Sequence, residues 1–165
     1  MFGFGKPKPQ KPSPAEVYVG LRNQLFTLNP SEIGLKPSTE TPVVWGVLME
    51  TGLKVATYTL VGLADGTTSL YFSNGGGMIG CGQHDSVAKA TARLIAMAQK
   101  FSPLLTATQT YPAPSKGQVR FYLLTFSGVL TSEAVEVELG NHHHQLSPLF
   151  HQCHEVIAAV RVTQE

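Results

Sequence analysis

The sequence predicts one α+β domain in which three helices flank an antiparallel sheet of five strands, in the order α-β-β-β-α-β-β-α. Apolar residues recur every three or four positions in three segments, and β-branched and aromatic residues gather in five others. Asp65-Gly66 lies between two of these β-rich segments and is a strong signal for a two-residue hairpin turn. Strands joined by short turns pair antiparallel, so we expect the helices to cover one face and one edge of the sheet.

The chain is expected to become ordered at Ser13. Residues 1–12 are dominated by Gly, Pro and Lys and predict a disordered tail, which leaves residues 13–163 as a single domain. Ser13, Pro14 and Glu16 have the spacing of a capping box with a proline in the first turn. The apolar face of this first helix is expected to comprise Tyr18, Leu21, Leu25 and Leu28.

Three strands should follow, at residues 43–49, 55–64 and 67–72. The first is almost wholly apolar and contains Trp45, which indicates a buried strand. Residues 50–52, Glu-Thr-Gly, are expected to form the turn that follows it.

A second helix, capped by Asp85 or Ser86, is expected after a glycine-rich run at residues 74–82. Residues 102–118 contain three prolines and predict a long loop. The buried stripe of this helix should be Val87, Ala90, Leu94, Met97 and Phe101, with Lys89, Arg93 and Lys100 on the opposite side.

Two further strands and a helix complete the predicted domain. The strands are expected at residues 119–127 and 132–139, and in the second of them Glu136 and Glu138 alternate with apolar residues and should face water. Ser147-Pro148 should begin the third helix, whose buried face would be Phe150, Cys153, Ile157 and Val160.

Composition narrows the class of protein. Apolar residues make up 42% of the chain, charged residues 14%, and the net charge is +1, so the whole chain does not resemble a nucleic-acid-binding protein. All charged residues between positions 86 and 132 are basic, and five of the six after position 132 are acidic. These charges could lie on solvated faces, or the basic segment could bind an anionic ligand or the acidic end of a second copy of the chain. No secretory signal or membrane-spanning apolar run is visible, so we expect a cytoplasmic protein with reduced cysteines and no membrane contact.

The glycine-rich run matches a nucleotide-binding pattern in its letters. Gly75, Gly77 and Gly80 satisfy G-x-G-x-x-G between a strand and a helix, where free N–H groups favour anions. A dinucleotide site also needs a parallel βαβ unit and an acid about twenty residues further on, and neither is indicated here. Two interpretations stay open: a hairpin strand or bulge packed on the core, or a small-ligand or anion site with Lys89 as counter-charge. The candidate binding residues are Asn74, Gly75, Gly76, Gly77, Gly80, Cys81, Gly82, His84 and Lys89.

Histidines are concentrated near the C-terminal end of the chain. His151 and His154 are three residues apart on one side of the expected helix and have the spacing to share a zinc or copper ion, whereas a solvated helix face is the alternative. Their order, H-x-x-H-E, differs from the H-E-x-x-H motif of metalloproteases. Cys153 should point into the core instead.

Groups typical of catalysis are scarce. Cys81 precedes an expected helix N-terminus, which lowers a thiol pKa, and His84 follows three residues later, but no third group orients this histidine. The chain has two aspartates and no G-x-S-x-G motif. We therefore assign no catalytic residue and no cofactor, and favour a protein that is not an enzyme.

The predicted order of elements resembles that of the small α+β secretion chaperones. That resemblance implies a homodimer that binds extended segments of partner proteins, and it concerns topology alone. The function expected is a non-enzymatic protein-interaction module, of adaptor or chaperone type, whose partner is another protein or a second copy. The alternatives are a small-ligand or anion-binding domain at residues 74–82 and a metal site at the C-terminal histidines.

Overall fold

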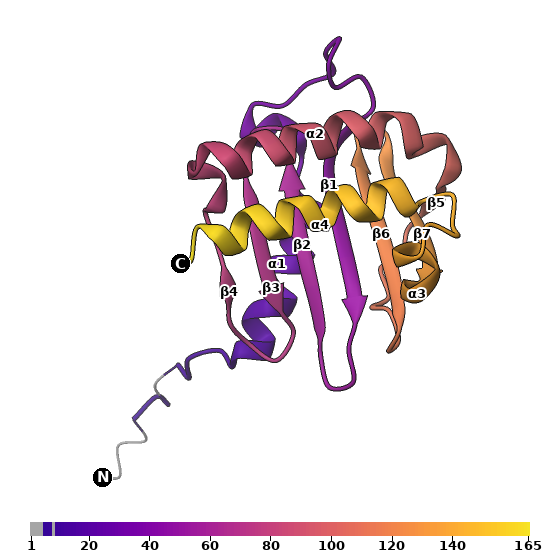
Figure 1. Ribbon diagram of the computed structural model, residues 1–165. Helices are drawn as coiled ribbons and strands as arrows, with labels where there is room; N and C mark the ends of the chain where they lie inside the picture. The colour runs from indigo at the N-terminus through magenta and orange to yellow at the C-terminus, as the bar shows by residue number, and fades with distance from the viewer. Residues whose placement is uncertain (1–4, 8) are drawn as a thin grey trace.

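The computed structural model describes residues 5–7 and 9–165, and its centre is one antiparallel sheet (Figure 1). Within these residues the sheet has seven strands in the spatial order β4-β3-β2-β1-β6-β7-β5. All neighbouring strands pair antiparallel, as the hairpin signals predict. The strands are β1 (Val44–Gly52), β2 (Thr57–Leu63), β3 (Thr68–Phe72), β4 (Gly77–Met78), β5 (Thr106–Thr108), β6 (Gln118–Thr125) and β7 (Gly128–Val135).

Four α-helices are present in the described part of the chain, together with three short 3₁₀ turns. The α-helices are α1 (Pro14–Thr27), α2 (Asp85–Phe101), α3 (Glu136–Gly140) and α4 (Ser147–Val162), and the 3₁₀ turns are η1 (Pro30–Ile33), η2 (Cys81–Gln83) and η3 (Ser102–Leu104). Helices α2 and α4 lie side by side across one face of the sheet, and α1 lies behind the sheet in the view of Figure 1. None of the described helices is long and apolar enough to cross a membrane.

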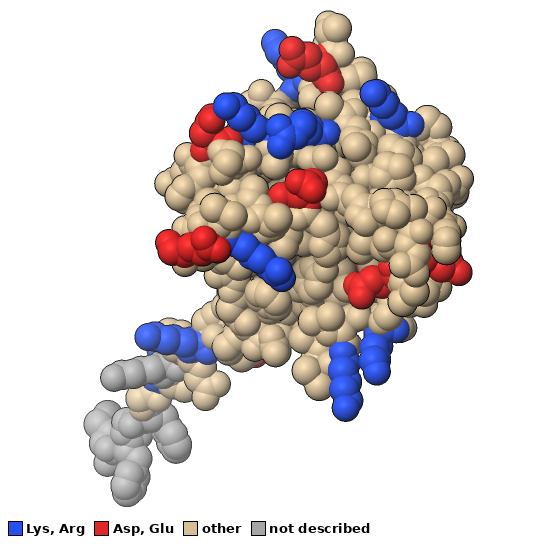
Figure 2. All heavy atoms as spheres, in the orientation of Figure 1, with Lys and Arg blue, Asp and Glu red and all other residues tan. Residues whose placement is uncertain are grey.

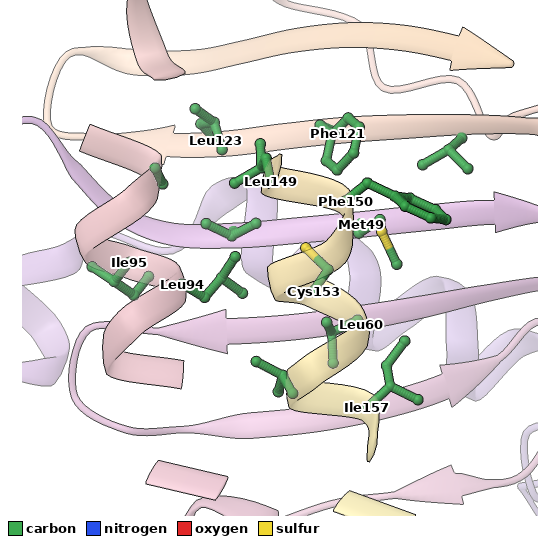
Figure 3. Packing of buried hydrophobic residues seen from close by; sticks show 14 of the residues in the cluster. Met49, Leu60, Leu94, Ile95, Phe121, Leu123, Leu149, Phe150, Cys153 and Ile157 are labelled. Carbon is green, nitrogen blue, oxygen red and sulfur yellow. The ribbon is translucent and has the colours of Figure 1, made fainter. Parts of the chain in front are cut away.

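The larger core lies between the sheet and the pair α2 and α4. Figure 3 shows α2 contributing Leu94 and Ile95 to it, and α4 contributing Cys153 and Ile157. Strand residues such as Met49, Leu60, Phe121 and Leu123 meet these side chains, and each of those four is fully buried. Burial of a side chain of this size stabilises the fold by about 2 kcal/mol, so this layer supplies much of the stability.

A smaller apolar cluster lies on the opposite face, under α1. Trp45, Leu48 and Tyr122 belong to its buried part, and Leu25 and Phe26 of α1 pack against it. The apolar contribution of α1 is modest, since Tyr18 is its one buried residue. The helices thus divide between two faces of the sheet, so the expectation of one covered face and one edge is wrong.

The fold class is confirmed, whereas the numbers of elements are not. The sheet has seven strands in the described residues and not five, because β4 forms inside the glycine-rich run and β5 forms inside the expected loop. The fourth helix is α3, which replaces the end of the strand expected at residues 132–139. Glu136 and Glu138 therefore belong to a helix and do not alternate along a strand.

Local signals at the helix starts are mostly correct. The hydroxyl of Ser13 accepts the Glu16 N–H at 3.2 Å and the Glu16 carboxylate accepts the Ser13 N–H at 3.3 Å, which is the predicted capping box. Helix α2 begins at Asp85, but its N-cap residue is His84, which makes no side-chain capping bond. Residues 5–7 and 9–12 of the expected tail are exposed and have no regular structure, and its other residues lie outside the described part.

Candidate functional site

The glycine-rich run forms the turn and short strand at one edge of the sheet. The Gly75 N–H donates to the Phe72 carbonyl at 3.0 Å and the Phe72 N–H donates to the Gly76 carbonyl at 3.2 Å, which closes a tight hairpin from β3 into β4. A side chain at Gly75 would collide with Pro14, the first residue of α1, and one at Gly82 would collide with the Gly66 carbonyl. A side chain at Gly77 would likewise collide with the Leu70 carbonyl, so three of the glycines are required because other parts of the chain approach them closely.

An apolar groove lies where this hairpin meets α1. Its volume is about 300 Å³, and Val17, Ile79 and Pro14 are among the residues around it. Val17 is 45% exposed and Ile79 is 71% exposed, so apolar surface continues outward from the groove. The full lining comes from α1, β3 and the glycine turn: Pro14, Val17, Tyr18, Leu21, Tyr71, Phe72, Gly75, Gly76, Gly77 and Ile79.

The remaining glycines face a different hollow. Gly80 and Gly82 line a space of about 290 Å³ beside the Asp65-Gly66 turn, together with Thr67 and Gln83. The candidate residues therefore divide, with Gly75, Gly76 and Gly77 in the apolar groove and Gly80 and Gly82 in this second hollow.

Four of the predicted binding residues lie in neither space. The Lys89 ammonium pairs with Asp85 at 2.8 Å on the exposed side of α2, one turn into the helix. Asn74 and His84 are exposed, and neither lines the groove or the second hollow. Cys81 is buried, and this burial raises the pKa of its thiol. The lowering of the Cys81 pKa by a helix N-terminus, considered from the sequence, is therefore wrong, because the short turn η2 places Cys81 in the core.

A buried ion pair holds α1 against the sheet beside the groove. Glu50 on β1 is fully buried, and the Arg22 guanidinium on α1 donates to its carboxylate through Nη2 at 2.7 Å and through Nε at 3.0 and 3.1 Å. The hydroxyls of Tyr18 and Thr59 also donate to Glu50 Oε2, at 3.0 and 2.8 Å. Each carboxylate oxygen is thus hydrogen-bonded, which offsets the cost of burying its charge.

Aromatic rings complete the surroundings of this ion pair. The Arg22 guanidinium lies 5.0 Å from the centre of the Phe26 ring and donates through Nη2 to the Tyr111 carbonyl at 2.6 Å. The rings of Phe26 and Tyr111 stack with centres 4.0 Å apart. Burial, followed by the negative charge of Glu50, raises the pKa of Tyr18 to about 12.

Sequence reasoning missed this network because it assigned residues 50–52 to a turn. Strand β1 continues through Gly52, which pairs with Thr57, and the turn falls after it. A signal was present in the sequence, since Arg22 is one helical turn after Tyr18 and lies on the same side of α1.

The C-terminal histidines are grouped but do not converge on a point. The rings of His142 and His151 stack with centres 4.2 Å apart, and His154 packs on Phe150 at 4.4 Å. The Nε2 atoms of His151 and His154 are buried and have no hydrogen-bond partner among residues 5–7 and 9–165. Burial, and then the neighbouring charges of His151 and Arg161, lower the pKa of His154.

A metal ion at His151 and His154 stays a prediction. Within the described residues no group of three or more His, Cys, Asp or Glu side chains is arranged to hold a metal. Cys153 is fully buried in the core, as expected, and its burial raises the pKa of its thiol.

Comparisons of this chain with protein-family models, with curated proteins and with solved structures return no match. The resemblance to the secretion chaperones concerned the predicted order of elements, and none of these comparisons supports it.

Proposed function

We propose that this chain is a non-enzymatic protein-interaction module that binds an extended apolar segment of a partner protein in the groove between α1 and the β3–β4 hairpin. The observation that carries the proposal is the lining of this groove, which is apolar at every side chain except the hydroxyls of Tyr18 and Tyr71. The Tyr18 hydroxyl is already hydrogen-bonded to Glu50. Apolar pockets with few polar groups are typical binding sites.

The position of the groove favours a polypeptide partner. Strand β4 is the outer strand of the sheet on this side, and Gly77 belongs both to β4 and to the groove. A sheet edge offers backbone hydrogen-bonding groups to an added strand, while an adjoining pocket accepts every second side chain of that strand. Strand β4 supplies the sheet edge, and the groove beside Gly77 supplies the adjoining pocket.

The surroundings of the groove argue against an anion site. Among the residues that the structure describes, its lining contains no lysine or arginine, and Lys89 is paired with Asp85 on another surface. The same volume of about 300 Å³ also suits a small apolar ligand, which is the second candidate.

The proposal is tested by selecting extended peptides on the purified protein from a displayed library. We expect apolar peptides that bind wild type and the Val55→Asp control equally, because Val55 is 83% exposed in the turn after β1. Ile79→Asp, at the rim of the groove, should weaken binding at least tenfold, since a charge must then be desolvated against an apolar side chain.

Equal binding to Ile79→Asp and wild type would contradict a groove-bound partner. If no peptide is selected and anilinonaphthalene sulfonate binds wild type but not Ile79→Asp, the small-ligand candidate replaces the proposal.

A further inference from the structure

The helical face of the molecule carries a second hollow, with a basic rim and an apolar floor. It lies between α2 and α4 and has a volume of about 430 Å³. Met97 and Phe101 are half-buried in it, whereas Arg93 and Lys100 are exposed at its rim. Within the described residues neither of these two cations has a carboxylate within 4.0 Å. The hollow therefore suits an apolar side chain that is flanked by acids.

The same chain presents a segment with this complementary chemistry. In α3, Val137 is 68% exposed and stands between Glu136 and Glu138. Neither glutamate forms an ion pair among the described residues. Val137 therefore offers an exposed apolar group with an acidic residue on either side of it in the sequence.

The two surfaces lie on the same side of the protein. Figure 1 shows α4 running across the sheet, with α2 above it and α3 below its N-terminal end. On that face Figure 2 shows basic side chains along the upper part, where α2 lies, with acidic side chains beside them, and further acidic side chains at the lower right, where α3 lies. A two-fold rotation about an axis parallel to α4 therefore brings α2 of one copy opposite α3 of the other, and the reverse.

We propose that two copies of this chain form a dimer through the helical face, in which Val137 of each copy enters the α2–α4 hollow of the other. Glu136 and Glu138 then face Arg93 and Lys100 across both symmetric contacts. The two-fold dimer leaves neither surface free to bind a third copy, because each copy uses both its hollow and its α3 segment in the same interface. It is independent of the proposed function, since the groove beside α1 lies on the other side of the sheet and stays open.

The chemistry of these contacts predicts a weak dimer that depends on salt. Charge pairs at the rim of an interface fix orientation and accelerate association more than they add affinity. Screening at about 1 M salt shortens the reach of these charges to about 3 Å, so the dimer dissociation constant should rise.

A charge swap tests the proposal in sedimentation and light scattering. Wild type should form dimers between about 1 and about 100 µM. The R93E/K100E variant and the E136K/E138K variant should each be monomeric there, because like charges then face each other at both contacts. An equimolar mixture of the two variants should restore a one-to-one dimer, since every contact becomes complementary again.

Matched controls separate these contacts from net charge. The K6E/K11E and E32K/E40K variants carry the same net charges as the two test variants, but their changes are exposed residues outside α2, α3 and α4. Each should dimerise like wild type. Circular dichroism confirms that each variant is folded.

Three results would overturn the proposal. They are a wild type that stays monomeric over this range, test variants that dimerise like wild type, and test variants whose mixture stays monomeric.

Discussion

The two faces of the sheet are built in different ways. The face under α2 and α4 is covered by a continuous apolar core, to which both helices contribute fully buried residues such as Leu94 and Cys153. The face under α1 has a smaller cluster, and its helix is held by the buried pair of Arg22 with Glu50. The apolar groove opens on this second face.

Under the proposed function, this difference separates the source of stability from the surface that binds the extended partner segment. A helix that is anchored by a specific ion pair keeps a fixed position although it buries little apolar surface, so apolar side chains such as Val17 stay available at its exposed side. The α2–α4 face gains its stability from packing, which leaves little room for a partner between helix and sheet.

The largest effect should come from the packed face. Leu94→Ala removes a fully buried side chain and should lower the free energy of unfolding by about 3 kcal/mol, because a cavity remains beneath α2. Urea denaturation measures this loss, with Ala92→Ser on the exposed side of α2 as the control, expected to change stability by less than about 0.5 kcal/mol. A loss for Leu94→Ala as small as that of the control would contradict a stability based on this core.

On the α1 face, the loss in the free energy of unfolding should be larger when one partner of the ion pair is removed than when both are replaced. Arg22→Met leaves Glu50 buried without its cation and should cost about 3 kcal/mol, whereas the double variant Arg22→Met, Glu50→Met should recover at least about 1 kcal/mol of that loss. A double-mutant cycle in urea measures the coupling. Strictly additive losses would show that the pair does not act as a unit.

The smallest effects should appear in the dependence of stability on pH. Burial and the charge of Glu50 raise the pKa values of Tyr18 and Tyr122 to about 12 in the folded protein. The unfolded chain loses these protons near pH 10, so stability should fall as the pH rises from about 10 towards about 12. Thermal unfolding should show a shallower alkaline decline for Tyr18→Phe, and an unchanged decline would contradict this origin.

At acidic pH, the dependence of stability on pH should come from His154, which lies in α4 on the other face of the sheet. Burial lowers the pKa of His154 below its ordinary value near 6.5, so the unfolded chain binds the proton first and stability should fall as the pH drops through about 6.5. His154→Gln should reduce this acid dependence in the same thermal series. An acid dependence equal to that of wild type would assign it to other groups.

Local signals predicted most of the fold, and contacts between distant residues explain what they missed. The capping box at Ser13 and a hairpin around Asp65-Gly66 depend on neighbouring residues and were predicted correctly. The turn of that hairpin has three residues and not the expected two, because Leu63 bonds to Thr67 across it. The strand expected at residues 132–139 ends at Val135, because its partner β6 begins at Gln118 and offers no residue beyond that pair. Strand β5 has three residues and exists through its pairing with β7, which lies more than twenty residues further along the chain.

The candidate site was predicted only in its outline. The glycine turn was identified as a place for a ligand, but part of the apolar lining comes from α1, which reaches Gly75 because α1 packs on that side of the sheet. The fixed position of α1 depends in turn on Glu50, which pairs with a residue 28 positions away. A pattern of neighbouring residues in the sequence cannot predict a pairing between residues so far apart.

Hydrogen–deuterium exchange with a selected peptide bound tests the central claim most directly, which is that the groove beside α1 is the binding surface. We expect slower exchange in residues 14–21 and 71–79 when the peptide is present, with α2 and α4 unchanged. Slower exchange in α2, α4 or β5 while residues 14–21 and 71–79 exchange as in the free protein would contradict the claim.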